Sequence, residues 1–263
     1  MLALICGTGG LPVQIAKAQA EKPLVCVMDG FAPDELDADL NFRLETLGSL
    51  LIQLGQHGVT DVCLCGAIDR PSLDPRKLDE HTAPLIPLIS DALTSGDDGA
   101  LRAVMRLFEQ TGFTVRAAHE LVPDLTAPPG VLSTTWPNAQ MREDAKLGAN
   151  VLAALAPMDV GQACVISGGQ LLGMETIGGT DFMLSHLPET PLRAQGVLFK
   201  GPKMGQDTRA DMPTIGPSTI ENAQKASLAG IVIDAGEVIL LQPEKCIALA
   251  NAVGLVLWSR TGE

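Results

Sequence analysis

The chain has 263 residues, enough for two domains that each bury a core of their own. Acidic residues outnumber basic ones 31 to 18, aromatic residues make up only 3%, and there is no tyrosine. The sequence therefore lacks the basic surface and the stacking side chains that nucleic-acid-binding proteins use. With 46% hydrophobic and 19% charged residues, the composition is typical of globular domains. We expect two such domains and no nucleic-acid partner.

The N-terminus and the cysteines indicate the compartment. The strand-like stretch LALIC follows Met1 directly, without the basic segment and cleavage site of a secretory signal. No apolar run reaches the roughly 20 residues that span a bilayer. The six cysteines form no C-x-x-C pair, and most lie in apolar strand-like runs where a free thiol behaves as a small hydrophobe. These patterns predict a cytoplasmic protein without zinc, and any membrane contact is expected to be peripheral.

Short apolar runs and helical stretches alternate along residues 1–128. We expect strands at 2–6, 24–28, 61–68 and 113–118, and helices at 12–20, 47–58 and 98–112. This alternation favours an α/β domain in which helices cover a parallel sheet.

A proline-rich stretch at 126–138 separates this part of the chain from the rest. We interpret 129–138 as a linker and 139–263 as a second α/β domain. In that domain we expect helices at 142–156, 218–230 and 243–254, strands at 230–234 and 238–242, and a hairpin within 163–177 that turns at Gly168 and Gly169. Ser218 and Glu221 have the spacing of a capping box.

The glycine-rich stretch CGTGGLP, residues 6–12, follows an expected strand and opens a helix. Gly9 and Gly10 would let a phosphate approach backbone N–H groups at the helix N-terminus. Pro12 stands where a dinucleotide fingerprint has its third glycine, whereas Asp29 lies at the position of a ribose-binding acid. Phosphate or nucleotide contact, NAD binding and a plain tight turn all remain open.

A second candidate stretch, GAIDRPSL, begins at residue 66, where a strand is expected to end. Open α/β sheets bind ligands at this edge. The planar guanidinium of Arg70 would grip a phosphate or a carboxylate, and a surface ion pair with Asp69 or Asp74 is the alternative.

Cations gather in one part of this acidic chain: between Arg193 and Arg209 there are four basic residues and one acid. If the following stretch is extended, as a residue before proline favours, Asp207, Arg209 and Asp211 project to one side. Carboxylates suit Mg²⁺, and lysine or arginine neutralises phosphate charge. Asp181, at the end of an expected glycine turn at 178–181, would add a third carboxylate. A salt-bridged strand with a charged turn is the alternative.

Several of these stretches resemble the LpxI family, the UDP-2,3-diacylglucosamine pyrophosphatases of lipid A biosynthesis in Gram-negative bacteria. The C-terminal signature is carried by GTDFML, KGPKMGQDTRADMPTIGPSTIENA and LAGIVIDAG, and the N-terminal half by ICGTGGLP, GAIDRP, GDDGALRAV and GFTVRAAHELVPDL. The motifs keep the family's order over essentially the whole chain. The chain departs from the pattern at Gly178, where the family often has Glu, and at Met204, where it often has Pro.

The resemblance implies a Rossmann-like N-terminal domain, a distinct C-terminal α/β domain, and a ligand in the cleft between them. The implied reaction is Mg²⁺-dependent hydrolysis of UDP-2,3-diacylglucosamine to UMP and 2,3-diacylglucosamine 1-phosphate (lipid X), with water attacking the sugar-side phosphorus. The lipid would bring the protein into transient contact with the inner membrane. A homodimer stays open, because no residue argues for or against it.

The resemblance also implies site residues. The essential acid is Asp207 or Asp211, and the choice between them stays open. Asp181, Asp207 and Asp211 are the expected metal ligands. The expected substrate-binding residues are Gly9, Gly10, Arg70, Thr180, Lys200, Lys203, Gln206, Arg209 and Thr214. Two other functions remain as alternatives: a nicotinamide-dependent oxidoreductase that uses the glycine loop, and a non-catalytic protein that binds a lipid-linked nucleotide.

Overall fold

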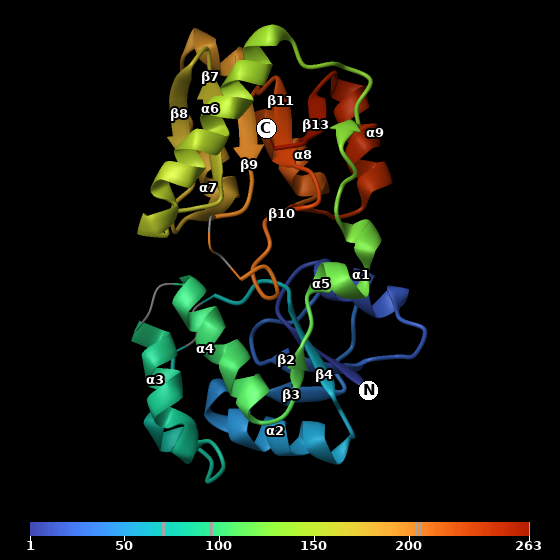
Figure 1. Ribbon diagram of the computed structural model, residues 1–263, viewed down its shortest axis with the longest axis vertical. Helices are drawn as coiled ribbons and strands as arrows, with labels where there is room; N and C mark the ends of the chain where they lie inside the picture. The colour runs from blue at the N-terminus through green and yellow to red at the C-terminus, as the bar shows by residue number, and fades with distance from the viewer. Residues whose placement is uncertain (70–71, 95–96, 204, 206, 263) are drawn as a thin grey trace. The chain divides into compact units, whose positions relative to one another are not determined.

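The computed structural model of the chain describes residues 1–69, 72–94, 97–203, 205 and 207–262 (Figure 1). It contains two compact units. Unit 1 consists of Met1–Pro123 together with Asp207–Asp211, and unit 2 of Asp124–Gln206 together with Met212–Glu263. A short segment from the second half of the chain therefore belongs to the N-terminal unit.

Unit 1 is built on a five-stranded sheet with the order β3-β2-β1-β4-β5, in which every neighbouring pair is parallel. The strands are β1 (Leu2–Cys6), β2 (Leu24–Met28), β3 (Leu40–Phe42), β4 (Asp61–Cys65) and β5 (Thr114–Val115). An order that runs outward in both directions from the first strand is that of Rossmann-type sheets. The predicted fold class of the N-terminal domain is confirmed.

The helices of unit 1 are α1 (Leu11–Ala18), α2 (Leu47–Gln56), α3 (Ile86–Thr94), α4 (Asp97–Gln110) and α5 (Ala118–Leu121). Leu50 and Leu54 of α2 and Met105 and Phe108 of α4 are fully buried against sheet side chains such as Ile5. Helical cover on a parallel sheet explains why its strands read as continuous apolar runs.

Unit 2 has a six-stranded mixed sheet with the order β6-β13-β11-β9-β7-β8. Its central strands β9 (Val197–Lys200), β11 (Gly230–Asp234) and β13 (Val256–Arg260) are parallel. The outer strands β6 (Gly130–Val131), β7 (Ala163–Ser167) and β8 (Gln170–Met174) pair antiparallel. Two short strands, β10 (Thr214–Ile215) and β12 (Ile239–Leu240), form a separate parallel pair.

The α-helices in the described part of unit 2 are α6 (Ala139–Leu155), α7 (Gly179–Ser185), α8 (Pro217–Lys225) and α9 (Pro243–Val253). In Figure 1, α6 lies across the strands β7 and β9, in agreement with its buried contacts to Cys164 and Phe199. Ile220 of α8 and Cys246 of α9 are buried with Ile231 and Leu257 of the sheet in another cluster. The mixed α/β character expected for the second domain is confirmed.

The predicted hairpin turn is present between β7 and β8. Gly168 and Gly169 have φ values of 58° and 77°, the left-handed conformation that glycine adopts without steric cost. The buried carboxylate of Asp144 accepts their backbone N–H groups at 2.9 and 2.8 Å. Helix α6 thus fixes the turn through a single side chain.

The structure differs from the sequence-based expectations at three places in unit 2. Residues 130–131, expected in a linker, form β6, because pairing with β13 satisfies their backbone groups. The expected glycine turn at 178–181 begins α7. The predicted capping box of Ser218 and Glu221 is wrong, since α8 begins at Pro217 and Thr219 Oγ1 accepts the N–H of Gly216 instead.

All six cysteines are buried and free. Among the helices in the described part of the chain, none is both long and apolar enough to cross a membrane.

Candidate functional site

The glycine loop lies between β1 and α1, at the carboxyl edge of the parallel sheet. Thr8 N–H donates to Ala67 O at 2.8 Å, and Ala67 N–H donates to Thr8 O at 3.0 Å. The loops that follow β1 and β4 therefore lie side by side, where the strand order reverses. This is the position at which open α/β sheets bind ligands.

Two kinds of glycine occur in this loop. A Cβ on Gly7 would lie 2.3 Å from Ala67 O, so Gly7 is required by the close approach of the two loops. A Cβ on Gly9 or Gly10 would meet no described heavy atom within 4 Å, and Gly9 has a φ of 94°. The backbone at Gly9 and Gly10, which we predicted to contact a ligand, thus borders open space. Arg70 lies outside the described residues.

The stretch Asp207–Asp211 is a turn, and the prediction that it is extended is wrong. The N–H groups of Ala210 and Asp211 both donate to Asp207 O at 3.3 Å, and the N–H of Arg209 donates to Asp207 Oδ1 at 3.1 Å. An aspartate side chain that accepts the N–H two residues on stabilises such a turn locally. The extended preference before Pro213 applies to Met212, which lies outside this turn.

Arg209 and Ala210 both connect the turn to the rest of unit 1. Arg209 donates from Nε and Nη2 to Asp207 at 2.9 and 2.7 Å, and from Nη1 to Glu109 Oε1 of α4 at 2.6 Å. Hydrogen bonding from Arg209 holds the pKa of Asp207 below its ordinary value, with the charge of Arg102 contributing in the same direction. Ala210 packs against the core of unit 1.

In unit 2, the parallel strands also end in charged side chains. Lys200 ends β9, Asp234 ends β11 and Arg260 ends β13, and β11 pairs with both neighbours in register. Lys200 is only 9% exposed, and its Nζ donates to Thr180 Oγ1 of α7 at 2.9 Å. The structure thus brings together two predicted substrate-binding residues that are 20 positions apart.

Asp234 and Arg260 form an ion pair that the sequence did not reveal. Arg260 Nε lies 2.7 Å from Asp234 Oδ1, and its guanidinium lies 4.9 Å from the ring centroid of Phe199. Burial raises the pKa of Asp234, and the nearby guanidinium partly offsets this. The pair is formed by register between strands that are far apart in sequence, so local spacing carries no signal for it.

Three other predicted residues of unit 2 have defined partners. Lys203 Nζ lies 2.5 Å from Asp159 Oδ1, and Asp159 has a φ of 51°, an uncommon conformation for a residue with a side chain. Asp181 Oδ1 accepts from Asn222 Nδ2 at 2.9 Å. Thr214 Oγ1 donates to Met212 O at 3.1 Å. Asp159 and Asn222 were not predicted from the sequence, because their contacts are also long-range.

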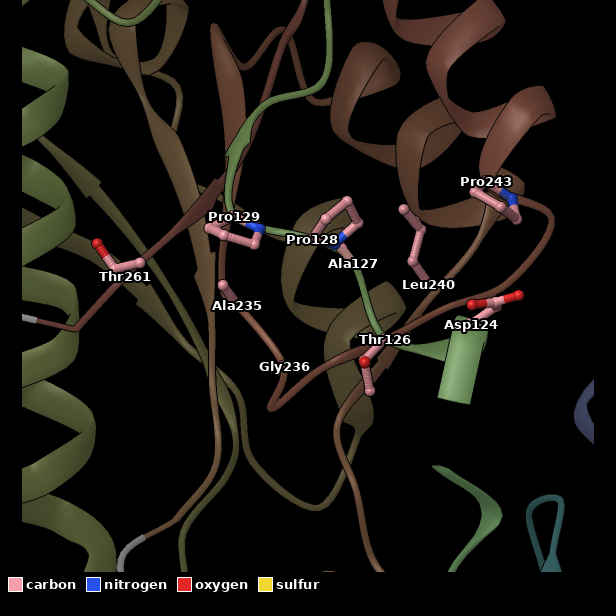
Figure 2. Close-up of a pocket in the computed structure, with 10 residues that line it drawn as sticks. All are labelled: Asp124, Thr126, Ala127, Pro128, Pro129, Ala235, Gly236, Leu240, Pro243 and Thr261. Carbon is pink, nitrogen blue, oxygen red and sulfur yellow. The ribbon is translucent and has the colours of Figure 1, made fainter. Parts of the chain in front are cut away.

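A cavity of about 570 Å³ opens beside the ends of β11 and β13 (Figure 2). Its wall is mainly apolar, with Pro128, Pro129 and Pro243 among its lining residues and Asp124 as an acidic group. Within the described part of the chain, no predicted site residue lines it. The cavity therefore does not coincide with the candidate site.

The predicted site residues fall into two groups. Gly9, Gly10, Asp207, Arg209 and Asp211 belong to unit 1, and Thr180, Asp181, Lys200, Lys203 and Thr214 belong to unit 2. Gln206, like Arg70, lies outside the described residues. The expectation that the ligand lies in a cleft between the units stays a prediction.

The described residues include no preformed cluster of three His, Cys, Asp or Glu side chains that would hold a metal ion. Mg²⁺ does not need one, since one or two carboxylates, water and substrate phosphates commonly complete its shell. Asp207 and Asp211 stand at the two ends of one turn and are carboxylates of the kind that this mode uses, and both oxygens of Asp207 also accept from Arg209. Asp181 belongs to the other unit and is bonded to Asn222.

A parallel Rossmann-type unit and a second α/β unit, each with charged or glycine-rich groups at the carboxyl ends of its strands, define a two-domain α/β protein. Residues 1–125 match the LpxI N-terminal domain and residues 128–258 match the LpxI C-terminal domain. The chain is 35% identical over 268 aligned positions to the UDP-2,3-diacylglucosamine pyrophosphatase LpxI of Caulobacter vibrioides, covering 97% of this chain and 95% of that protein. The chain belongs to the LpxI family.

Proposed function

We propose that the chain hydrolyses the diphosphate of UDP-2,3-diacylglucosamine, yielding UMP and 2,3-diacylglucosamine 1-phosphate for lipid A biosynthesis. The observation that carries the proposal is the 35% identity to a named UDP-2,3-diacylglucosamine pyrophosphatase across 97% of the chain. Charged and glycine-rich groups at the carboxyl edges of both sheets support it, because a nucleotide diphosphate needs cations and backbone N–H donors.

The side-chain roles follow from the chemistry of diphosphate hydrolysis, which depends mainly on aligning a water molecule and neutralising phosphate oxygens. Lys200, Lys203 and Arg209 are proposed to contact the phosphates. Asp211 is proposed to orient the attacking water and accept its proton, with Asp207 as the alternative. Gly9 and Gly10 would donate backbone N–H groups to the nucleotide.

Mg²⁺ is part of the proposal, with the carboxylates of Asp207 and Asp211 as its protein ligands and Asp181 as a third candidate. When bound, the ion would supply positive charge to the phosphate oxygens. The pairing of Asp207 with Arg209 keeps that carboxylate ionised, as a metal ligand must be.

In the proposed reaction, the water oxygen forms a bond to the sugar-side phosphorus. The bond between that phosphorus and the bridging oxygen breaks, UMP leaves with the bridging oxygen, and the water proton passes through the carboxylate to solvent. Hydrolysis in ¹⁸O-labelled water should therefore place the label in 2,3-diacylglucosamine 1-phosphate. Label in UMP would overturn the assignment of the attacked phosphorus.

The experiment that tests the function is incubation of the purified chain with UDP-2,3-diacylglucosamine and Mg²⁺ in detergent micelles, with UMP measured by chromatography. We expect UMP and the sugar phosphate in equal amounts, and loss of both products with EDTA. Saturable binding without UMP would instead mean a lipid-nucleotide-binding protein. Turnover of a nicotinamide cofactor without UMP would favour an oxidoreductase.

We further propose that the enzyme is cytoplasmic and meets the inner membrane transiently through its lipid substrate. Cosedimentation with vesicles that contain UDP-2,3-diacylglucosamine, compared with vesicles that lack it, tests this. Equal binding to both would contradict it.

A further inference from the structure

Glu109 lies outside every motif that points to the site, on α4 of unit 1. Its Oε1 lies 2.6 Å from Arg209 Nη1, 100 residues further along the chain. The side chains of Glu109 and Arg209 are 40% and 36% exposed. A surface pair of this kind contributes little to stability on its own, so its position is the more informative property.

The guanidinium of Arg209 is held from two sides. Nη1 meets Glu109, whereas Nε and Nη2 form the two-pronged contact with the carboxylate of Asp207 at 2.9 and 2.7 Å. A planar guanidinium with both edges occupied has little rotational freedom left, so the carboxylate it grips is also fixed in orientation. Glu109 therefore reaches Asp207 through one intervening side chain.

The Glu109–Arg209 contact also helps to attach the whole Asp207–Asp211 turn to unit 1. Asp207–Asp211 groups with unit 1, although the residues before and after it belong to unit 2. Among the described residues, the Glu109–Arg209 pair and the packing of Ala210 on the core help to attach it to unit 1, and the charge of Arg102 also acts on Asp207. The ion pair fixes the direction of the Arg209 side chain, whereas apolar packing tolerates rotation.

We propose that Glu109 is a positioning residue for the hydrolysis, holding Arg209 so that Arg209 keeps the Asp207–Asp211 turn in its working geometry. This inference rests on the proposed function. Catalytic groups need to be held within about half an ångström of the productive geometry by neighbours that do not touch the substrate. Glu109 fills that role from the N-terminal unit.

A double-mutant cycle on UMP release tests the proposal. Glu109→Gln is expected to lower kcat about tenfold with little change in KM, since a hydrogen bond to a charged group is lost but no substrate contact is. Arg209→Met should lower kcat further. Because Glu109 acts through Arg209, adding Glu109→Gln to Arg209→Met should lower kcat by no more than about twofold. Glu109→Asp, which keeps the carboxylate, should recover part of the rate.

Glu120→Gln is the matched control, because Glu120 is also a half-exposed glutamate of unit 1 paired with an arginine, Arg116 at 3.1 Å. It should keep the wild-type kcat, with a thermal midpoint no higher than that of Glu109→Gln. A wild-type rate in Glu109→Gln, or the same tenfold loss in the Arg209→Met background, would overturn the positioning role alone. No UMP from the wild-type chain would overturn the proposed function, and the positioning role with it.

Discussion

Lys200 and Thr180 are joined by a hydrogen bond of 2.9 Å from Nζ to Oγ1, which connects the carboxyl end of β9 to the first turn of α7. Lys200 is 9% exposed, so its ammonium group is held at the end of a buried strand. Desolvation makes a buried cation costly unless its partners compensate. We therefore propose that Lys200 is placed there for ligand binding and not for stability.

Replacing Lys200 with Met should separate these two roles. An apolar side chain of similar length removes the desolvation penalty, so the free energy of unfolding should stay within about 1 kcal/mol of wild type or rise. UMP release should fall about 100-fold or more, because a phosphate-neutralising charge is lost. Urea unfolding and steady-state kinetics measure the two effects. Lys245→Met, at an exposed lysine of α9, is the control and should change neither.

Substitutions in the glycine loop should also affect stability and binding separately. Gly7→Ala should destabilise unit 1 by about 3 kcal/mol, because its Cβ would lie 2.3 Å from Ala67 O. Gly10→Ala should leave the free energy of unfolding within about 0.5 kcal/mol of wild type, since the added methyl group meets open space.

If Gly10 borders the bound nucleotide, Gly10→Ala should raise KM about tenfold at unchanged thermal midpoint. An unchanged KM would remove this loop from the substrate site and return it to the plain-turn interpretation. Denaturant titration and substrate saturation curves on the same preparations decide between the outcomes.

The ionisation of Glu45 should make the stability of the protein depend on pH. Its buried carboxylate accepts the N–H of Asp74 at 2.9 Å, and this hydrogen bond lowers the pKa of Glu45 from its ordinary value of 4.5. A carboxyl group whose pKa is lower in the folded state stabilises the fold above pH 4.5, and the contribution declines as the pH falls through the folded-state pKa. The contact fixes the backbone at Asp74.

Glu45→Gln should therefore lower the free energy of unfolding by about 1 kcal/mol at pH 7, where wild-type Glu45 is ionised. Near pH 3 it should change the free energy of unfolding by close to nothing. Urea unfolding of both proteins at the two pH values gives the difference directly. A cost that is equal at pH 3 and pH 7 would mean that the charge of Glu45 plays no part.

Local patterns were enough for much of the fold. The alternation of apolar runs and helices predicted the parallel sheet of unit 1, and the Gly168–Gly169 pair predicted the hairpin, because both depend on residues close in sequence. The linker prediction missed β6, whose pairing with β13 requires a partner more than 120 residues away. Sequence spacing carries no information on such a contact.

In the candidate site, too, local patterns were predicted from the sequence and long-range contacts were not. The motif around 200–214 supplied candidate residues whose roles stay a prediction. The extended conformation expected for Asp207–Asp211 was wrong, since Asp207 stabilises a turn through its own side chain. The partners Glu109, Asp159 and Asn222 come from other elements and were not predicted. The assignment of Asp207–Asp211 to unit 1 likewise depends on Glu109 and on core packing, which are tertiary interactions.

The two aspartates of the turn should differ in their response to substitution. Asp207→Asn weakens a two-pronged contact with Arg209. The turn should therefore be less well held, and kcat should fall about as much as in Arg209→Met. Asp211→Asn should remove the proton acceptor while the Asp207–Arg209 contact remains. The kcat of each variant, with circular dichroism as a check on folding, distinguishes these roles. Wild-type kcat in Asp211→Asn would leave Asp207 as the essential acid.

The most direct test of the central claim is UMP release from UDP-2,3-diacylglucosamine and Mg²⁺ by the wild-type chain and by Asp211→Ala. We predict stoichiometric UMP from the wild-type protein and a rate lower by about 100- to 10,000-fold in a variant that keeps the wild-type thermal midpoint. Absence of UMP with a folded wild-type protein that binds the substrate would contradict the assignment of this chain as a hydrolase.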